Sequence, residues 1–248
     1  KQFKVSAGLF KKSLKINALD NISFNLTEKQ TLAIVGESGS GKSTLVKAIT
    51  GLLKPDSGLI DIFGTDVVNS NTKDLKAVRR NMQMIFQDPL DSLNPRMKII
   101  DSVAEGLIAY NVMPKNKIRP YLAKIFKDCK LNESDLDKLP GEFSGGQRQR
   151  ICIAKALALK PKILIADEAV SALDLSVQKT VLELLKSLKD KYNISILFIT
   201  HDLRVVKEIA DTVLVMQKGK IVEFNETKSI FKAPISDYTK QLLNAIPG

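Results

Sequence analysis

The stretch Gly36-Glu37-Ser38-Gly39-Ser40-Gly41-Lys42-Ser43-Thr44 decides the fold of this chain. The apolar run at 31–35 before it is typical of a strand, and residues 45–50 after it are typical of a helix start. Glycines at this spacing expose backbone N–H groups to phosphate, the lysine reaches the terminal phosphates, and the next hydroxyl ligates magnesium. Glycine-rich turns usually have no chemical role, but the strand and helix on either side favour a phosphate-binding P-loop over a plain turn.

Length and composition bound the class of protein. The chain has 248 residues, and its 44% hydrophobic residues suffice for a core in one large α/β domain or two small ones. The longest apolar runs fall far short of the roughly twenty residues that a membrane helix needs, and no signal peptide is expected. The two cysteines, Cys129 and Cys152, lie far apart and are expected to be reduced thiols.

The net charge of +11 raises the question of nucleic-acid binding, because basic proteins gain affinity by neutralising phosphates. The lysines are dispersed along the whole chain, however, and aromatic residues make up only 6% of it. This pattern favours a solvated, lysine-rich surface, with attraction to an anionic membrane face as a second use.

Strand and helix patterns alternate along the chain, which predicts a mainly parallel sheet with right-handed crossovers. Between about 90 and 160 the strand patterns fade and apolar residues recur at helical spacing, which predicts a helical insert. The expected strands are 22–26, 31–35, 59–64, 82–86, 163–166, 194–199, 213–216 and 221–223, and the expected helices are 74–81, 99–110, 118–129, 151–158, 177–188 and 237–245.

Polar residues follow two buried-strand patterns, at the strand ends where open α/β sheets bind ligands. Asp167 can hold a magnesium shell, and the neighbouring Glu168 can orient or deprotonate an attacking water. The ordinary alternative is a solvated acidic pair. His201, the only histidine, can donate to a γ-phosphate oxygen or to that water. A lone histidine is usually an ordinary surface or core residue, so spacing alone leaves its role open.

A second glycine-rich helix start is found at Ser144-Gly145-Gly146-Gln147. Backbone N–H groups at such a helix start form an anion site. Because the phosphates already have a cradle at Lys42, a second cradle indicates that two chains share each ATP, and two-fold pairing gives two shared sites. Gln87, between a strand and Pro89, could reach magnesium or water, although its position alone does not assign it.

The whole set resembles the ATP-binding subunit of an ABC transporter, over essentially the whole chain. Its elements are the P-loop, Gln87, Ser144–Gln147, Asp167-Glu168, Ser171-Ala172-Leu173-Asp174 and His201. The segments 86–89, 92–96 and 142–147 resemble the oligopeptide, dipeptide, glutathione and nickel importer group. The resemblance implies an α/β P-loop NTPase with a mainly parallel core, an N-terminal antiparallel β subdomain and an inserted helical subdomain. It implies a single domain over 1–248, with the core in 1–90 and 160–248 and the helical part in about 91–159.

The resemblance also implies roles at matching positions. Lys42, Glu168 and His201 would be catalytic, with Glu168 as base and His201 as γ-phosphate sensor. Asp174 would lie at a dimer seam, and Phe10 would stack on adenine. The ATP-binding set is Gly36, Glu37, Ser38, Gly39, Ser40, Gly41, Lys42, Ser43, Thr44 and Gln87, the magnesium set is Ser43, Gln87 and Asp167, and the contacts to ATP on the opposite subunit come from Ser144, Gly145, Gly146 and Gln147.

Three residues depart from the family pattern. Ala169 and Val170 replace the usual proline and threonine, and Phe143 replaces leucine. None of these changes removes a catalytic group, so an active enzyme is still expected. Members of the peptide and nickel group often continue beyond the region 238–247, so the chain could be truncated, half of a fused double-domain protein, or a member without the extension.

The resulting expectation is an ATPase that binds ATP and Mg²⁺. It would lie at the cytoplasmic face of the membrane and power an importer for peptides or related solutes. Its partners would be a second copy or a related ATPase, two permease subunits and, indirectly, an extracytoplasmic solute-binding protein, with no nucleic acid. The alternatives are a soluble ABC ATPase acting on nucleic acid or ribosomes, and an inactive regulatory module. Selection of the transported solute is expected to lie in the permease and the solute-binding protein.

Overall fold

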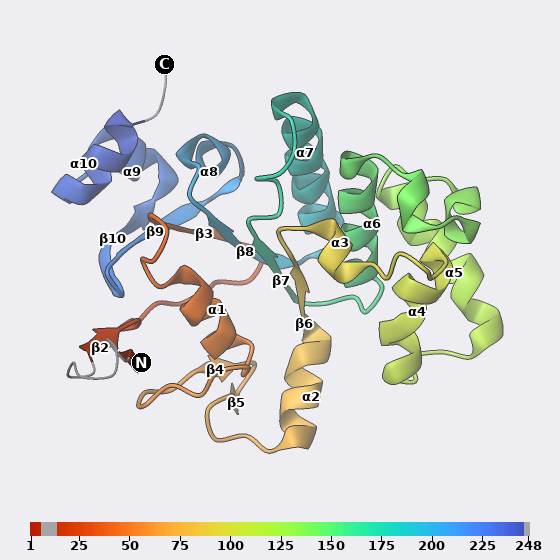
Figure 1. Cartoon of the computed structure of the whole chain (residues 1–248), viewed down its shortest axis with the longest axis horizontal. Coiled ribbons are helices and arrows are strands. Elements are labelled where there is room, and N and C mark those ends of the chain that lie inside the picture. The colour runs from red at the N-terminus through yellow and green to blue at the C-terminus, as the bar shows by residue number, and fades with distance from the viewer. Residues whose placement is uncertain (6–13, 246–248) are drawn as a thin grey trace. The chain divides into compact units, whose positions relative to one another are not determined.

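The computed structural model describes residues 1–5 and 14–245, which divide into two compact units (Figure 1). Unit 1 contains the described residues of 1–26, 32–79 and 200–248, and unit 2 contains 27–31 and 80–199. Segments from both ends of the sequence, drawn in orange and blue in Figure 1, therefore build unit 1 together. The boundaries of the expected helical subdomain stay a prediction.

The strands of unit 1 are parallel where they support the P-loop. β3 (Thr31–Val35), of which residues 32–35 belong to this unit, is buried along its whole length and pairs in parallel with β9 (Thr212–Gln217). β10 (Lys220–Glu226) pairs antiparallel with β9, with a register shift between Ile221 and Glu223. The expected strands at 31–35, 213–216 and 221–223 are thus confirmed.

Helices flank these strands. They are α1 (Lys42–Ile49), α2 (Thr72–Asn81, whose last two residues fall in unit 2), α8 (Leu203–Ile209), α9 (Thr227–Lys232) and α10 (Asp237–Asn244). The expected helices at 74–81 and 237–245 are confirmed, whereas α8 and α9 were not expected. Three of these helices, α8, α9 and α10, share one apolar cluster with β3 and β9, which consists of Ala33, Val35, Leu203, Val206, Val213, Val215, Ile230 and Tyr238.

Two short antiparallel pairs complete unit 1: β1 (Gln2–Val5) with β2 (Leu14–Asn17), and β4 (Asp61–Ile62) with β5 (Thr65–Asp66). The strand expected at 22–26 is wrong: its side chains alternate between half-buried and exposed, but the backbone joins no ladder. The strand expected at 59–64 is shortened, because Phe63 and Gly64 adopt φ 56° and 78° and turn the chain into a hairpin.

Unit 2 contains three parallel strands: β6 (Met82–Ile85), β7 (Ile163–Asp167) and β8 (Ser195–Thr200, with 195–199 in this unit). Ile85 is paired with Ala166, and Asp167 with Ile199, so the strands end at the same edge. This arrangement confirms the expected parallel pairing and places the residues that follow the strands beside one another.

The helices of unit 2 are α3 (Pro89–Ser92), α4 (Ile99–Ala109), α5 (Lys115–Asp128), α6 (Gly145–Leu157) and α7 (Leu175–Tyr192), with short 3₁₀ helices η1 (Glu133–Asp137) and η2 (Pro140–Glu142). The expected helices at 99–110, 118–129, 151–158 and 177–188 are confirmed. Their apolar faces share a core whose fully buried members include Leu107, Leu122, Phe126, Leu136 and Ile151.

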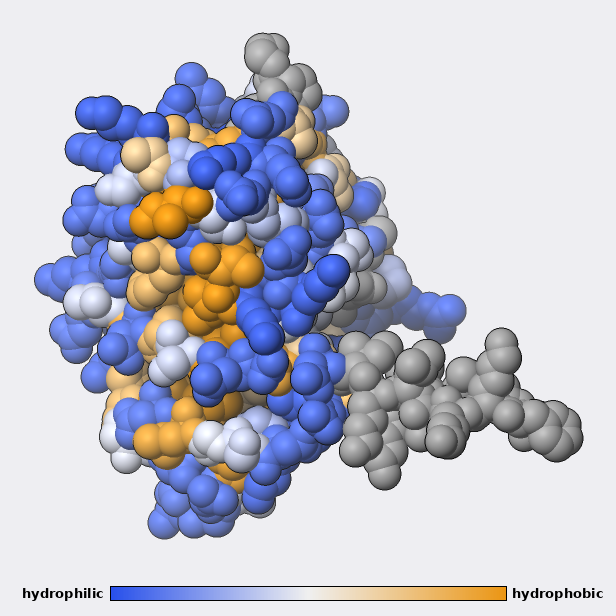
Figure 2. Space-filling view, turned by 90° about the vertical axis from the view of Figure 1, so that its left-hand side faces the viewer, coloured by the Kyte–Doolittle hydropathy of each residue, from blue (hydrophilic) through white to orange (hydrophobic). Residues whose placement is uncertain are grey.

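The surface is predominantly hydrophilic on the face drawn in Figure 2, where apolar residues gather in a central band. Cys129 and Cys152 are both free and buried, and burial raises the pKa of each thiol to about 12. Among the described residues, no helix combines the length and the apolar character needed to cross a membrane.

Candidate functional site

The P-loop joins β3 to α1 and is fixed by close approaches to other backbone segments of unit 1. A Cβ on Gly36 would lie 2.2 Å from the carbonyl oxygen of Met216, so only glycine fits there. The N–H of Gly219, in the turn between β9 and β10, donates to the carbonyl of Ser40 (2.9 Å). The loop is therefore shaped by residues nearly two hundred positions further along the chain.

Lys42, the first residue of α1, has a largely buried side chain, with 7% of the residue exposed. Its Nζ donates to the carbonyl oxygens of Gly36 (2.6 Å) and Glu37 (2.9 Å). The ammonium group is thus held inside the loop by the loop's own backbone. Ser43 is exposed at the same helix start, where the helix dipole favours an anion.

His201 belongs to unit 1 and is exposed directly after β8. The neighbouring Asp202 caps α8, since its carboxylate accepts from the N–H of Arg204 (2.9 Å). The Arg204 side chain also donates to this carboxylate and lowers its pKa. A short helix start thereby fixes the backbone on the C-terminal side of His201.

Gln87 and Asp167 follow neighbouring parallel strands of unit 2. Gln87 is exposed two residues after β6, and Asp167 is the last residue of β7. Because Ile85 and Ala166 are paired in register, both side chains leave the same edge of the sheet. Gln87 and Asp167 thus follow strands that end at one edge of the sheet, and their roles as site residues stay predictions.

Glu168 adopts a left-handed backbone with φ 48°, which is uncommon for a residue other than glycine. Its N–H donates to the carbonyl of Ile199 in β8 (2.9 Å), and its carbonyl accepts from both the N–H (3.0 Å) and the hydroxyl (2.9 Å) of Ser171. These contacts hold a strained conformation at a strand end, a pattern that often accompanies functional residues.

The stretch Ser144–Gln147 begins α6 with a complete capping box. The Ser144 hydroxyl accepts from the N–H of Gln147 (3.3 Å), and the Gln147 side chain accepts from the N–H of Ser144 (2.9 Å). Ser144 and Gly145 are exposed. The helix start is therefore ordered by its own residues and accessible from outside.

Helix α6 approaches α7 closely at Gly146, where a Cβ would lie 2.5 Å from Cγ1 of Val177. Asp174 is exposed at the start of α7, beside Leu175, which is 69% exposed. Sequence patterns did not single out Leu175. Its signal would have been an apolar residue directly after the aspartate that precedes the helix.

Within unit 1 the structure places the P-loop and His201, and within unit 2 it places Gln87, Asp167, Glu168, Ser144–Gln147 and Asp174. Phe10, expected to stack on adenine, lies outside the described residues. The three residues that depart from the family pattern are all buried. Ala169 and Val170 are at most 2% exposed. Phe143 is also buried, and the Lys138 ammonium lies 5.5 Å from the centroid of its ring.

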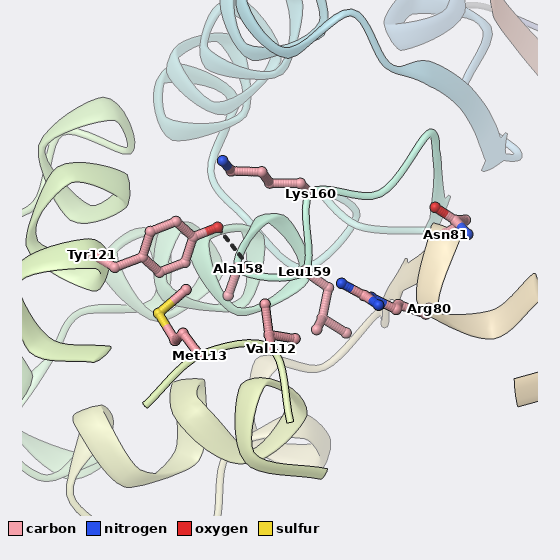
Figure 3. Close-up of a pocket in the computed structure, with 8 residues that line it drawn as sticks. All are labelled: Arg80, Asn81, Val112, Met113, Tyr121, Ala158, Leu159 and Lys160. Carbon is pink, nitrogen blue, oxygen red and sulfur yellow. Dashed lines mark hydrogen bonds between the residues drawn. The ribbon is translucent and has the colours of Figure 1, made fainter. Parts of the chain in front are cut away.

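A cavity of about 280 Å³ lies elsewhere in unit 2, near the start of β6 (Figure 3). The Tyr121 hydroxyl donates to the carbonyl of Ala158 (2.8 Å), and the Lys160 ammonium lies 5.6 Å from the Tyr121 ring centroid. None of the predicted site residues lines this cavity, whose walls are Arg80, Asn81, Val112, Met113, Tyr121, Ala158, Leu159 and Lys160.

Comparison with known proteins gives the family. Residues 19–171 match the ABC transporter family. The chain belongs to this family. The matched range begins before the P-loop and ends after Glu168, so it includes the signature at Ser144–Gln147, and the resemblance inferred from the sequence is confirmed.

Curated relatives of this ABC transporter chain are ATP-binding proteins of peptide transport. The di/tripeptide transport ATP-binding protein DppF of Pseudomonas aeruginosa is 41% identical over 248 residues, covering 100% of this chain and 77% of the relative. The oligopeptide transport ATP-binding protein OppF of Escherichia coli is 44% identical over 94% of this chain and 70% of the relative. OppD of Mycobacterium tuberculosis is 46% identical, and the chain spans 38% of its length.

Solved ABC structures share the fold. CbiO1 of Clostridium perfringens, described as part of an ABC transporter complex, superposes with a TM-score of 0.80 at 29% identity, covering 94% of this chain and 90% of that one. The cassette MJ0796, described as a dimer in a post-hydrolysis state bound to ADP and Pi, gives 0.78 at 29% identity over 92% and 95% of the two chains. The α/β class with a mainly parallel sheet is confirmed.

Proposed function

We propose that this chain is the ATP-hydrolysing subunit of an ABC importer for peptides or related small solutes, attached peripherally to the cytoplasmic face of a membrane. The observation that carries the proposal is the 41% identity to a di/tripeptide transport protein along the entire chain. The P-loop lysine, the carboxylates at the end of β7 and the capped glycine-rich start of α6 supply the groups that such an ATPase needs.

Each unit contributes its own groups to the proposed reaction. In unit 1, the P-loop and Lys42 would bind the phosphates, and His201 would donate to the γ-phosphate. In unit 2, Glu168 would accept the proton of the attacking water. The structured backbone around Glu168 supports this role, because a fixed strand end limits the positions that its carboxylate can take.

The residues expected at the metal fit magnesium in their chemistry. Ser43, Gln87 and Asp167 offer only oxygen ligands, which Mg²⁺ prefers, and Ser43 and Gln87 are exposed. When bound, the ion would neutralise charge on the phosphates.

A two-fold dimer is the assembly that the exposed groups support. Ser144, Gly145, Asp174 and Leu175 are all exposed in unit 2, and the first two form a helix start suited to an anion. In the proposed dimer this helix start would contact ATP held by the partner, and Leu175 would supply apolar contact area. Two permease subunits and an extracytoplasmic solute-binding protein complete the proposed transporter.

The alternative of an ABC ATPase acting on nucleic acid is not favoured. The net charge of +11 was the reason to consider it. The curated relatives reported above, however, are named for peptide transport. An inactive regulatory module is weakened by the presence of Glu168, because the group expected to activate water is in place.

ATP binding and turnover by purified wild-type protein, Lys42→Ala and Glu168→Gln test the proposal in one experiment. Lys42→Ala is expected to weaken ATP binding about 10- to 100-fold, since a charge-assisted contact is removed. Glu168→Gln is expected to lower turnover about 10²- to 10⁴-fold while ATP binding persists and a dimer accumulates.

Unchanged hydrolysis in Glu168→Gln would remove Glu168 from its role, and normal ATP binding in Lys42→Ala would count against the phosphate cradle. Stimulation of the wild-type ATPase by reconstituted permease supports the transport function. Stimulation by DNA or RNA instead would contradict it.

A further inference from the structure

Helix α10 carries one aromatic residue to the P-loop of unit 1. The backbone N–H of Glu37 donates to the Tyr238 hydroxyl at 3.1 Å, across 201 positions of sequence. Tyr238 is buried, with 7% of the residue exposed. The hydrogen bond itself is partly buried, because its acceptor lies in the core while Glu37 is exposed. Losing the acceptor therefore removes the partner that the core supplies to this N–H, which weakens the support of the loop.

The Glu37 N–H belongs to the same peptide group as the carbonyl of Gly36. That carbonyl accepts from Lys42 Nζ at 2.6 Å. A peptide group is planar, so contacts to its N–H and to its C=O together fix its rotation about the chain. Tyr238 and Lys42 therefore hold one peptide group of the P-loop from its two polar ends.

The position of the Tyr238 ring is set by the core. The ring is packed in the apolar cluster with Val35 of β3, Val215 of β9, Val206 of α8 and Ile230 of α9. Since these neighbours come from four elements, the ring does not depend on its hydroxyl for its place. Removing the hydroxyl alone is expected to leave the packing of unit 1 intact.

The start of α10 is fixed from a second side by Glu223 of β10, which is 8% exposed. Its two carboxylate oxygens accept from the N–H groups of Ile235 (2.9 Å) and Ser236 (3.0 Å), directly before the helix. The helix that delivers Tyr238 is thereby tied to the strand next to β9.

We propose that Tyr238 is a positioning residue of the nucleotide site. Its hydroxyl fixes the peptide group between Gly36 and Glu37 and thereby sets the carbonyl that orients Lys42. The inference rests on the proposed function, in which this loop binds ATP. It assigns to α10 a direct part in nucleotide affinity, which neither its sequence pattern nor its distance along the chain from the P-loop indicates.

The variant Tyr238→Phe tests this role, with Gln241→Ala as the matched control on an exposed position of the same helix. Loss of one hydrogen bond predicts an increase of about 3- to 10-fold in the Kd and KM for ATP. Because Tyr238 contacts the loop and no reacting group, kcat should stay within about twofold. Gln241→Ala should match the wild type in all three constants.

Hydrogen exchange of the Glu37 amide gives a readout that changed packing alone does not move. Exchange should accelerate in Tyr238→Phe and not in Gln241→Ala, with equal melting temperatures as the check on folding. Glu223→Gln, which keeps the ring but weakens the tie to 235–236, should raise the Kd in the same direction by a smaller factor and keeps the test informative if Tyr238→Phe folds poorly.

Two outcomes overturn the inference: a Kd for Tyr238→Phe equal to that of the wild type, or the same loss in Gln241→Ala. A wild-type protein that binds no ATP overturns the proposed function itself, and the inference falls with it. The two failures are distinguishable because only the second appears before any substitution is made.

Discussion

Two helices of this protein begin at glycine-rich stretches, and they are built in opposite ways. At α1 in unit 1, the capping residue Gly41 has a left-handed backbone with φ 108° and provides no side-chain cap. A Cβ at Gly41 would lie 2.4 Å from the carbonyl oxygen of Ala18. At α6 in unit 2, Ser144 and Gln147 cap the helix by themselves.

The difference extends to burial. Ser40 and Lys42 of the P-loop are at most 7% exposed, although residues 37–39 and Ser43 of the same loop are exposed, whereas Ser144 and Gly145 are both exposed. A helix start enclosed by distant backbone segments suits a ligand held by one chain. A helix start that is complete by itself and open to the outside suits a ligand delivered by another chain, as the proposed dimer requires.

Alanine substitutions at Gly36 and Gly146, two glycines with close neighbours, should show the largest difference between the starts of α1 and α6. Gly36→Ala is expected to cost about 3 kcal/mol or more of unfolding free energy, because its Cβ would meet the backbone oxygen of Met216 at 2.2 Å, and this oxygen cannot rotate away. Gly146→Ala should cost about 1–2 kcal/mol, since its Cβ would meet a methyl group of Val177 that can shift. Chemical denaturation measures both.

Gly145→Ala is the control for α6, because its Cβ would find Leu173 Cδ2 at an ordinary 3.7 Å. The double variant Gly146→Ala with Val177→Ala should recover part of the loss. Equal costs at Gly36 and Gly146 would contradict the contrast between an enclosed and a self-contained helix start.

Removing the cap of α6 should have a smaller effect on stability and a selective effect on assembly. Ser144→Ala deletes the acceptor for the Gln147 N–H and is expected to cost about 1 kcal/mol of unfolding free energy. ATP binding by the monomer should be unchanged, because the P-loop lies in the other unit. ATP-dependent dimers, trapped in a Glu168→Gln background and measured by light scattering, should be lost.

The exposed Ser176 on α7 provides the comparison for this prediction, since Ser176→Ala leaves the cap untouched. Dimers that persist in Ser144→Ala at wild-type concentrations would show that the second helix start does not contact the shared nucleotide.

The smallest expected effect concerns the support of the P-loop through Glu223. Burial tends to raise the pKa of this carboxyl, but the N–H of Ile235, the Thr239 hydroxyl, the N–H of Ser236 and the Lys240 charge together outweigh it and hold the pKa below its ordinary value of 4.5. A lowered folded-state pKa stabilises the fold above the unfolded-state value, and this stability is lost as the pH falls through the folded-state pKa.

Unfolding free energies measured from pH 6 downwards should therefore decline below about pH 4.5 more steeply in the wild type than in Glu223→Gln. The expected difference is small, about 0.5 kcal/mol, the lower end of the net contribution of one hydrogen bond, because glutamine at this position keeps one acceptor oxygen. Parallel pH profiles for the two proteins would show that Glu223 is not responsible.

Much of the fold was predictable from the sequence, because burial imposes periodic patterns on long elements. The run at 163–166 and the helical spacing at 177–188 correctly gave β7 and α7. The alternation of apolar and polar residues at 22–26 led to a wrong strand prediction. Alternate burial needs only an extended chain, whereas a strand also needs a hydrogen-bonded neighbour. The hairpin at Phe63-Gly64 was missed because phenylalanine rarely adopts a positive φ.

The candidate site divides in the same way. Local motifs pointed to the P-loop and to the residues after β7, since glycine spacing and strand ends are visible in short windows. The contact between Glu37 and Tyr238 joins residues 201 positions apart, and no local pattern carries it. Exposure of Leu175 at the start of α7 likewise depends on which face the tertiary structure leaves uncovered.

The distance between Glu37 and Tyr238 also has a consequence for biosynthesis. A ribosome adding about 5–20 residues per second needs about 10–40 s to pass from one to the other. Throughout that interval the nascent chain contains its P-loop sequence but lacks the tyrosine that holds Glu37, and for most of it the chain also lacks β9, which pairs with β3. Unit 1 therefore cannot finish folding around the P-loop while the chain is half made, and the loop's full support is one of the last things translation supplies.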